Sequence, residues 1–393
     1  MSNDTQPEIR FPGFTEAWEQ RKLGEVSKIG DIDHRMPPSV DDGIPYLMTG
    51  DFIEENELNF ENTKLVSEDD YLQLSKKIRP EYGDILFARY ASVGAVRYVS
   101  THRKFLISYS CAIIKPFSDI DGQFLYPTLK TQKMQQKIEF EINPNSQKNI
   151  GIDSLKKLPL FIPKMDEQQK IGTFFKQLDD TIALHQRKLD LLKETKKGFL
   201  QKMFPKNGAK VPEIRFPGFT EDWEERRLQE VVDRYDNLRI PITASKRVAG
   251  NTPYYGANGI QGYVEGYTHD GEFILVAEDG ANDLKNYPVQ YVDGKVWVNN
   301  HAHVIQAKEN LADNMFLMNA IRSINIEPFL VGGGRAKLNA DVLMKLEVII
   351  PLKSEQQKIG AFFKQLDDTI ALHQRKLDLL KETKKGFLQK MFV

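Results

Sequence analysis

The chain has 393 residues, with 54 Lys and Arg against 55 Asp and Glu, so its net charge at pH 7 is −1. This length leaves room for two or three domains that each bury a core. The start of the sequence is polar, so we expect no signal peptide. No apolar stretch is long enough to cross a membrane, so we expect no membrane span. The single cysteine, Cys111, lies in an apolar run. We expect it to be buried and unpaired, in a cytoplasmic protein.

Two blocks of sequence occur twice. The short repeat, PEIRFPGFTEAWEQRKLGEV at residues 7–26, returns with four changes at residues 212–231. The helical repeat, residues 167–204, returns at residues 355–392 with one change, Thr173 against Ala361. Packed cores tolerate many apolar substitutions, so packing alone does not explain this identity. The repeated blocks therefore indicate contact with something constant.

Two variable segments separate the repeats, at residues 27–160 and 232–348. The first contains the strand-like runs IPYLMTGDF, DILFARY, GAVRYVS and FLISYSCAIIKP. The second contains TPYYGANGIQGYV, EFILVAE and VQYVDGKVWVNNHAHVIQ. Both end in a polar, basic loop, a short helix and an apolar strand that stops at Pro163 or Pro351. The pattern predicts one β-rich fold with two different surfaces.

Each helical repeat shows apolar residues at alternating spacings of four and three, which is typical of a coiled-coil seam. Each helix is predicted to start after an N-cap, Asp166 or Ser354. We interpret the two seam histidines as polar residues that set the register of the helices, rather than as ligands of a metal site. The predicted seam consists of Leu178, Ile182, His185, Leu189, Leu192, Lys196, Phe199 and Met203, and of Leu366, Ile370, His373, Leu377, Leu380, Lys384, Phe387 and Met391.

The order of the blocks predicts how the helices pair. A helix from Ile171 to Met203 would be about 50 Å long. The short linker after it leads directly into the second copy of the short repeat, so the second helix should run back along the first. We therefore expect an antiparallel, pseudo-twofold pair with a variable segment at each end. Val393 should then lie near the start of the chain.

The predicted architecture is an α+β fold with two β-rich domains separated by two long antiparallel coiled-coil helices. The expected divisions are 1–165 for the first domain with its short repeat and 166–204 for the first helix. They continue with 205–353 for the second domain and 354–393 for the second helix.

No pattern in the chain predicts catalysis. Asn251–Thr252–Pro253–Tyr254 is close to an amino-methyltransferase motif, but its second position is Thr and no glycine-rich methyl-donor loop accompanies it. The chain has no HExxH, GxSxG, Cys/His cluster or P-loop motif. The acidic pairs Asp179–Asp180 and Asp367–Asp368 are expected to lie on solvated helix faces. The chain is predicted to be non-catalytic.

The repeated blocks, the IPYLMTGDF and GDILFARYASVGAV runs and the twice-used strand–Pro–EQQKI junction resemble the specificity subunit of type I restriction–modification enzymes. The resemblance covers essentially the whole chain. It implies that each variable segment reads half of a split double-stranded DNA target. It also implies helices that hold the halves apart and bind two methyltransferase subunits, with motor-nuclease subunits joining the complex. S-adenosylmethionine, ATP and magnesium are then expected on the partners, with no cofactor in this chain and no obligate homo-oligomer.

The resemblance names no base-contacting residue, so the DNA-contact candidates come from polar and basic loops alone. They are Arg89, Tyr90, Ser92, Arg97, Gln147, Lys148 and Asn149 in the first segment, and Tyr255, Asn258, Asn300, Arg335 and Lys337 in the second. Two alternatives stay open. One is a duplicated coiled-coil adaptor that binds two proteins and no nucleic acid, and the more distant one is a solitary methyltransferase.

Overall fold

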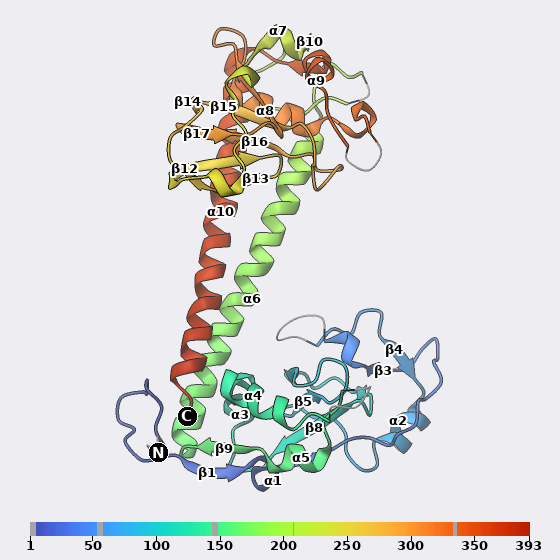
Figure 1. Ribbon diagram of the computed structural model, residues 1–393. Coiled ribbons are helices and arrows are strands. Elements are labelled where there is room, and N and C mark those ends of the chain that lie inside the picture. Colours follow the sequence, from blue (N-terminus) through green and yellow to red (C-terminus); the bar gives the residue numbers. More distant parts are fainter. Residues whose placement is uncertain (1–4, 53–57, 144–147, 207, 333–335) are drawn as a thin grey trace. The chain divides into compact units, whose positions relative to one another are not determined.

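The computed structural model describes residues 5–52, 58–143, 148–206, 208–332 and 336–393 (Figure 1). The chain divides into two compact units. Unit 1 comprises Met1–Gln186 and Arg375–Val393, and unit 2 comprises Arg187–Gln374. Each unit thus contains half of each repeated helix. This division into two units is a different one from the four predicted domains, whose boundaries remain a prediction. In the described part of the chain, no helix is long and apolar enough to cross a membrane.

The elements of the first half begin with the short repeat and end with the first long helix. They are β1 (Glu19–Lys22), α1 (Leu23–Val26), β2 (Ser27–Gly30), β3 (Ile44–Leu47), β4 (Lys64–Val66), α2 (Glu68–Leu74), β5 (Ile85–Ala88), β6 (Val96–Tyr98), β7 (Leu106–Ile107), β8 (Cys111–Pro116), α3 (Gly122–Lys130), α4 (Gln132–Phe140), α5 (Ile152–Lys157), β9 (Pro159–Ile162) and α6 (Met165–Lys202).

The second half follows a similar order, with β14 in place of α2 and the single helix α8 where the first half has α3 and α4. Its elements are β10 (Glu224–Arg227), α7 (Leu228–Val231), β11 (Val232–Arg234), β12 (Ala249–Gly256), β13 (Gly259–Val264), β14 (His269–Asp270), β15 (Phe273–Ala277), β16 (Val289–Val292), β17 (Lys295–Val298), β18 (Ala302–Ala307), α8 (Asn314–Ser323), α9 (Ala340–Lys345), β19 (Glu347–Ile350) and α10 (Lys353–Lys390).

The two variable segments share one sheet topology, as predicted. The main sheet has the order β2-β8-β5-β6 in unit 1 and β11-β18-β15-β16 in unit 2. A smaller sheet, β4-β3-β7 or β13-β12-β17-β14, accompanies it, and its pairs β3–β7 and β12–β17 are parallel. The run FLISYSCAIIKP therefore forms two strands, β7 and β8, that belong to different sheets.

The main sheet of each unit is buried on both faces. Along β5, Ile85 and Phe87 pack into the core that contains α3, α4 and α5, whereas Leu86 packs into the core beneath the smaller sheet. Burial on both faces explains why these strands read as continuous apolar runs rather than as alternating ones. Cys111 lies in the second of these cores, and burial raises the pKa of its thiol to about 12. The prediction of a buried, unpaired cysteine is confirmed.

The EQQKI junction owes its identity in part to contacts inside each unit. Arg10 of the short repeat donates two hydrogen bonds to the buried carboxylate of Glu167, at 2.6 and 2.7 Å. Arg215 binds Glu355 in the same way, at 2.8 Å for both bonds. Both carboxylates lie in the first turn of a long helix, where the helix dipole favours negative charge. In each unit, an ion pair thus links the short repeat to the first turn of the helical repeat.

The next residues of the junction hold the helix against the variable segment. Gln168 accepts a hydrogen bond from the backbone of Asp121 at 2.9 Å, and Gln356 accepts one from Asp313 at 3.0 Å. Gly172 permits close approach, because a Cβ there would lie 2.9 Å from the backbone of Gln123. Part of the repeat identity therefore reflects contacts inside each unit.

The long helices start slightly earlier than predicted. α6 begins at Met165 and α10 at Lys353, because the carbonyls of Lys164 and Leu352 already accept the first helical hydrogen bonds. The predicted N-caps, Asp166 and Ser354, thus lie inside the first turn.

Within each unit the two helix halves run antiparallel. In unit 1, Phe174 contacts Phe387 edge-on at 5.0 Å between ring centroids, and Asp179 pairs with Lys384 at 2.6 Å. In unit 2, the equivalent lysine, Lys196, pairs with Asp367. Asp179 and Asp367 were expected to be solvated, and this expectation was wrong. A lysine held in a largely buried position needs a nearby carboxylate to offset its loss of water.

All the predicted seam positions are buried or half-buried, His185 and His373 among them. Leu184 and Leu191 of the same helix are 65% and 68% exposed. Among the residues that the structure describes, no group of three His, Cys, Asp or Glu is placed to hold a metal ion.

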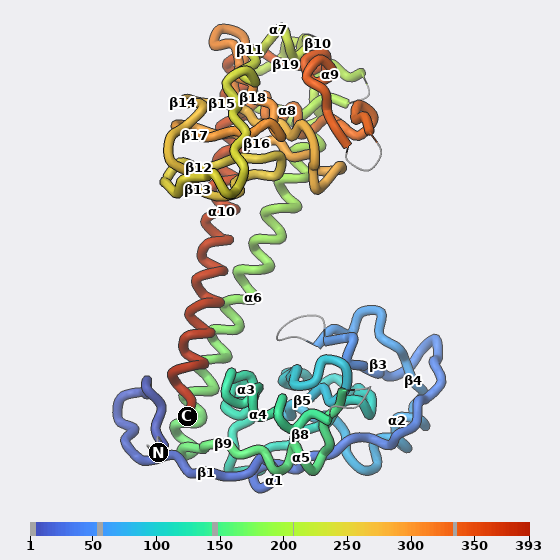
Figure 2. The backbone as a smooth tube through the Cα atoms, viewed as in Figure 1, coloured from blue at the N-terminus to red at the C-terminus, as the bar shows by residue number. Residues whose placement is uncertain are grey.

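The short repeat near the start of the chain lies beside the last residues of α10 in unit 1 (Figure 2). Ile9 donates a backbone hydrogen bond to Lys390 at 2.9 Å. Val393 packs against the cluster that contains Trp18 and Phe392. The prediction that Val393 lies near the start of the chain is confirmed. Unit 2 repeats the contact through Ile214 and Lys202, at 3.0 Å.

Candidate nucleic-acid interface

Each unit has a three-residue crossover at which the chain passes from the smaller sheet to the main sheet. The crossover of unit 1 is Ser108–Ser110, and that of unit 2 is Asn299–His301. The first residue donates its backbone N–H to the smaller sheet, at Leu47 O in unit 1 and Tyr255 O in unit 2. The two crossovers are therefore structurally equivalent.

The segment that follows the central strand faces this crossover. Arg89 N donates to Ser110 O in unit 1, and Glu278 N donates to His301 O in unit 2. The next residue forms an isolated β-bridge, Tyr90 with Asn149 in unit 1 and Asp279 with Lys337 in unit 2. One backbone frame thus recurs in both units.

The side chains on this shared frame differ at nearly every position. Where unit 1 has Ser108, Tyr109 and Ser110, unit 2 has Asn299, Asn300 and His301. Tyr90 and Asn149 correspond to Asp279 and Lys337. A constant frame that carries variable polar side chains is the arrangement expected of a surface that distinguishes between ligands of one class.

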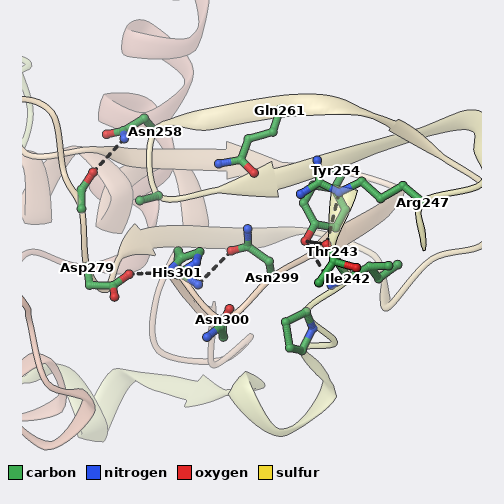
Figure 3. Close-up of a pocket in the computed structure, with 13 residues that line it drawn as sticks. Ile242, Thr243, Arg247, Tyr254, Asn258, Gln261, Asp279, Asn299, Asn300 and His301 are labelled. Carbon is green, nitrogen blue, oxygen red and sulfur yellow. Dashed lines mark hydrogen bonds and ion pairs between the residues drawn. The ribbon is translucent and has the colours of Figure 1, made fainter. Parts of the chain in front are cut away.

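In unit 2 the frame borders a cavity of about 540 Å³ (Figure 3). Its lining is rich in amide, hydroxyl and charged groups. The lining residues are Pro241, Ile242, Thr243, Arg247, Tyr254, Ala257, Asn258, Gln261, Asp279, Gly280, Asn299, Asn300 and His301.

Several of these side chains fix the shape of the cavity. Asn258 donates to Gly280 O and accepts from Asn282 N, both at 2.9 Å, and so holds the loop after β15. The imidazole of His301 bonds to the Asp279 carboxylate. At the other end, Arg247 lies over the ring of Tyr254, 4.0 Å from its centroid.

A buried charge network supports the frame of unit 2. His303 bonds to Asp236 at 2.8 Å, and Arg239 bonds to Glu278 at 2.7 Å. Burial alone would raise the pKa of both carboxyl groups. The hydrogen bonds from His303 to Asp236, and from Arg239 and Lys337 to Glu278, outweigh it, and both pKa values are lowered. Both carboxylates therefore stay ionised at neutral pH.

Unit 1 supports its frame with a different set of charges. Asp31 takes the place of Asp236, and its carboxylate binds the buried guanidinium of Arg89, His34 Nε2 at 3.0 Å and Lys77 Nζ at 3.2 Å. Burial opposes ionisation of Asp31, but these three partners together lower its pKa. His34 also stacks on Tyr109 of the crossover, at 5.0 Å between centroids.

We expect Asp31→Asn to destabilise unit 1 by about 3–5 kcal/mol at pH 7, because it leaves Arg89 buried without a counter-charge. The folded pKa of Asp31 lies below its unfolded value of about 3.9. Its contribution to stability is therefore complete above about pH 5, shrinks as the pH falls below the unfolded pKa and is lost once the pH has fallen through the folded pKa. Urea unfolding at several pH values should show the difference between wild type and variant shrinking in acid.

The exposed neighbour Asp33 provides the control. Asp33→Asn makes the same chemical change and should alter the free energy of unfolding by less than about 0.5 kcal/mol. Equal effects of the two substitutions would contradict a supporting role for Asp31.

The structure divides the candidates of the first segment into two groups. Arg89 and Arg97 are 6% and 7% exposed. Arg89 binds Asp31 and Ile150 O, and Arg97 lies in β6, not in a loop, and binds Val96 O and Phe52 O. Both guanidinium groups support the fold and are removed from the DNA-contact set.

The remaining candidates of the first segment lie at or near the frame. Tyr90 and Asn149 form the bridge and are half-buried, while Ser92 and Lys148 are exposed. Gln147 lies outside the described residues.

In the second segment, Asn258 and Asn300 line the cavity, and Lys337 borders it through its bridge with Asp279. Lys337 also pairs with Glu278 at 2.9 Å. Tyr255 instead packs against the core between the two sheets of unit 2. Arg335 lies outside the described residues.

Sequence reasoning missed Arg247, Gln261, Asn299 and His301, which also line the cavity. One signal for the last two was present. The run VWVNNHAHVIQ changes abruptly from apolar to polar and back, which marks a break between two strands.

The comparisons with known proteins agree with this architecture. The family model described as the type I restriction modification DNA specificity domain matches residues 15–194 and again residues 220–382. The crystal structure of the type I restriction–modification S subunit from M. genitalium shares the fold, with a TM-score of 0.73, 18% identity and coverage of 99% of both chains.

Two curated relatives carry related names. A putative type I restriction enzyme specificity subunit of Haemophilus influenzae, S.HindORF215P, is 47% identical over 154 residues, and the match spans 39% of this chain and only 39% of that relative. The putative MjaX specificity subunit of Methanocaldococcus jannaschii is 23% identical over 404 residues, which cover 95% of this chain and 92% of the relative. The family model covers most of the chain, in two copies, and the chain therefore belongs to the family of type I restriction–modification DNA specificity subunits.

Proposed function

We propose that the chain reads a bipartite double-stranded DNA target, with one half-site for each variable segment. The observation that carries the proposal is the pair of equivalent crossovers, which present different polar side chains on one backbone frame. Polar side chains on loops distinguish base edges, whereas a shared frame gives both domains the same docking geometry. A duplicated frame fits a split target because two linked readers fix the spacing of two half-sites.

The long helices hold the two half-sites apart and bind two methyltransferase subunits, through which motor-nuclease subunits join the complex. The exposed leucines on the repeated helices support this assignment. Leu184, Leu191, Leu372 and Leu379 are 63–68% exposed on helices that are otherwise rich in charge. Their exposure in both copies suits a partner surface better than it suits solvent.

Catalysis belongs to the partners in this proposal. The chain selects the site, and the methyltransferase subunits bind S-adenosylmethionine and act on the base, which must leave the helix stack to react. ATP and magnesium serve the motor-nuclease subunits. The chain itself needs no cofactor.

Sequencing of methylated bases in cells that express the chain with its methyltransferase subunits tests this function. We expect methylation in a motif of two defined half-sites separated by unspecified base pairs. DNA binding by the purified complex should fall steeply with salt, because each neutralised phosphate releases counterions. The chain alone should transfer no methyl groups.

Salt-insensitive binding of protein partners, with no preference for any DNA, would support the duplicated adaptor instead. Methyl transfer by the isolated chain would contradict the division of roles.

A further inference from the structure

Two amide side chains point into the unit 2 cavity from different elements. Gln261 comes from β13, and Asn299 comes from the crossover between β17 and β18. Figure 3 shows both side chains extending into the space between these elements. Gln261 is exposed, whereas Asn299 is 3% exposed.

The frame orients both amides. The Asn299 carbonyl oxygen accepts a hydrogen bond from His301 N at 2.8 Å, so its amino group is the part presented to the cavity. Gln261 lies over Gly256, where a Cβ would come within 2.2 Å of the Gln261 nitrogen. The absence of a side chain at Gly256 therefore makes room for Gln261 in this position.

We propose that Gln261 and Asn299 are specificity-determining residues of the second half-site: the Gln261 carboxamide selects adenine at one position, and the Asn299 amino group supplies a further donor in the same cavity. This inference rests on the function proposed above. A carboxamide carries a donor and an acceptor side by side, which matches the N6 donor and N7 acceptor of adenine in the major groove. Guanine offers two acceptors there and cytosine one donor, so either base leaves part of the amide unpaired.

Among the residues that the structure describes, the unit 1 frame carries no such pair. Ser108 occupies the position of Asn299, and its hydroxyl accepts from Ser110 N at 3.2 Å and from the Ser110 hydroxyl at 3.0 Å. The amide pair therefore acts on the second half-site alone, and its loss leaves the first half-site unchanged.

Gln261 is the residue to vary, because it is exposed and its replacement spares the core. Gln261→Ala should relax selection at one position of the second half-site, by about 5- to 100-fold in relative affinity. Gln261→Glu removes the donor and should move the preference at that position towards cytosine, whose amino group a carboxylate accepts. The readouts are the methylation motif in cells and the binding of the complex to duplexes that differ at single positions.

Gln229→Glu is the matched control. It makes the same change at an exposed amide on α7, away from the cavity, and should leave the motif as in the wild type. Thermal unfolding of each variant establishes that the fold is retained.

The possible outcomes distinguish a failure of this inference from a failure of the proposed function. A wild-type complex without any bipartite motif would overturn the proposed function, and the inference with it. A wild-type bipartite motif that both Gln261 variants retain would overturn the inference alone. A change confined to the first half-site would also overturn it.

Discussion

The double substitution Leu189→Asp with Leu377→Asp is expected to unfold the paired helices or to cost several kcal/mol of stability. Each leucine is 1% exposed, on α6 and α10 respectively. A carboxylate at such a position loses its hydration and gains no partner, which typically costs several kcal/mol for each charge. Urea unfolding followed by circular dichroism should show a large fall in the transition midpoint.

Leu191→Asp with Leu379→Asp is the matched control for this prediction. It introduces the same charges on the same two helices, two residues further along, where the leucines are 68% and 63% exposed. We expect the free energy of unfolding to change by less than about 0.5 kcal/mol at each position.

The control pair also tests partner binding. If the exposed leucines form the methyltransferase surface, the control variant should fold normally and yet assemble poorly with its partners. Normal stability of the buried variant would contradict the seam assignment, and normal assembly of the exposed variant would contradict the docking surface.

Replacing residues 27–160 with the equivalent segment of a relative is expected to change the first half-site completely and to leave the second unchanged. The replaced segment holds the unit 1 crossover, its bridge and nearly all of the two cores around the main sheet. Effects at distant, independent sites are nearly additive, so the second reader should not respond. Affinity for DNA with the original first half-site should fall by a large part of the 10³–10⁷-fold margin that separates specific from non-specific binding.

The contacts with the repeats decide which donor segments will fold. The donor needs a helix that packs against Gly24, where a Cβ would lie 2.8 Å from the Cβ of Lys156. It also needs a backbone N–H in the place of Asp121, to bond Gln168. A methylation motif in which both half-sites change after the swap would refute independent readers.

The sequence by itself determined the duplicated organisation, the two long helices and most of the strands. These features are local: identity between copies is read directly, and a seam of alternating spacings or a continuous apolar run reflects the geometry of a single element. The prediction that Val393 lies near the start of the chain followed from the order of the repeated blocks alone. The hydrogen bond between Ile9 and Lys390 confirms it. The amide residues Asn258 and Asn300 were found because they lie in conspicuously polar turns.

Only the tertiary structure decided what the charged residues do. Arg89 looked like a DNA contact until the fold brought Asp31, 58 residues earlier in the chain, against its guanidinium. Asp179 looked solvated until the second helix placed Lys384 beside it. Gln261 lies on β13 and Asn299 in the crossover after β17, and they meet at one cavity only because the smaller sheet joins β13, β12 and β17. A charge or an amide takes its role from the groups around it, and those groups come from distant parts of the chain that no local pattern brings together.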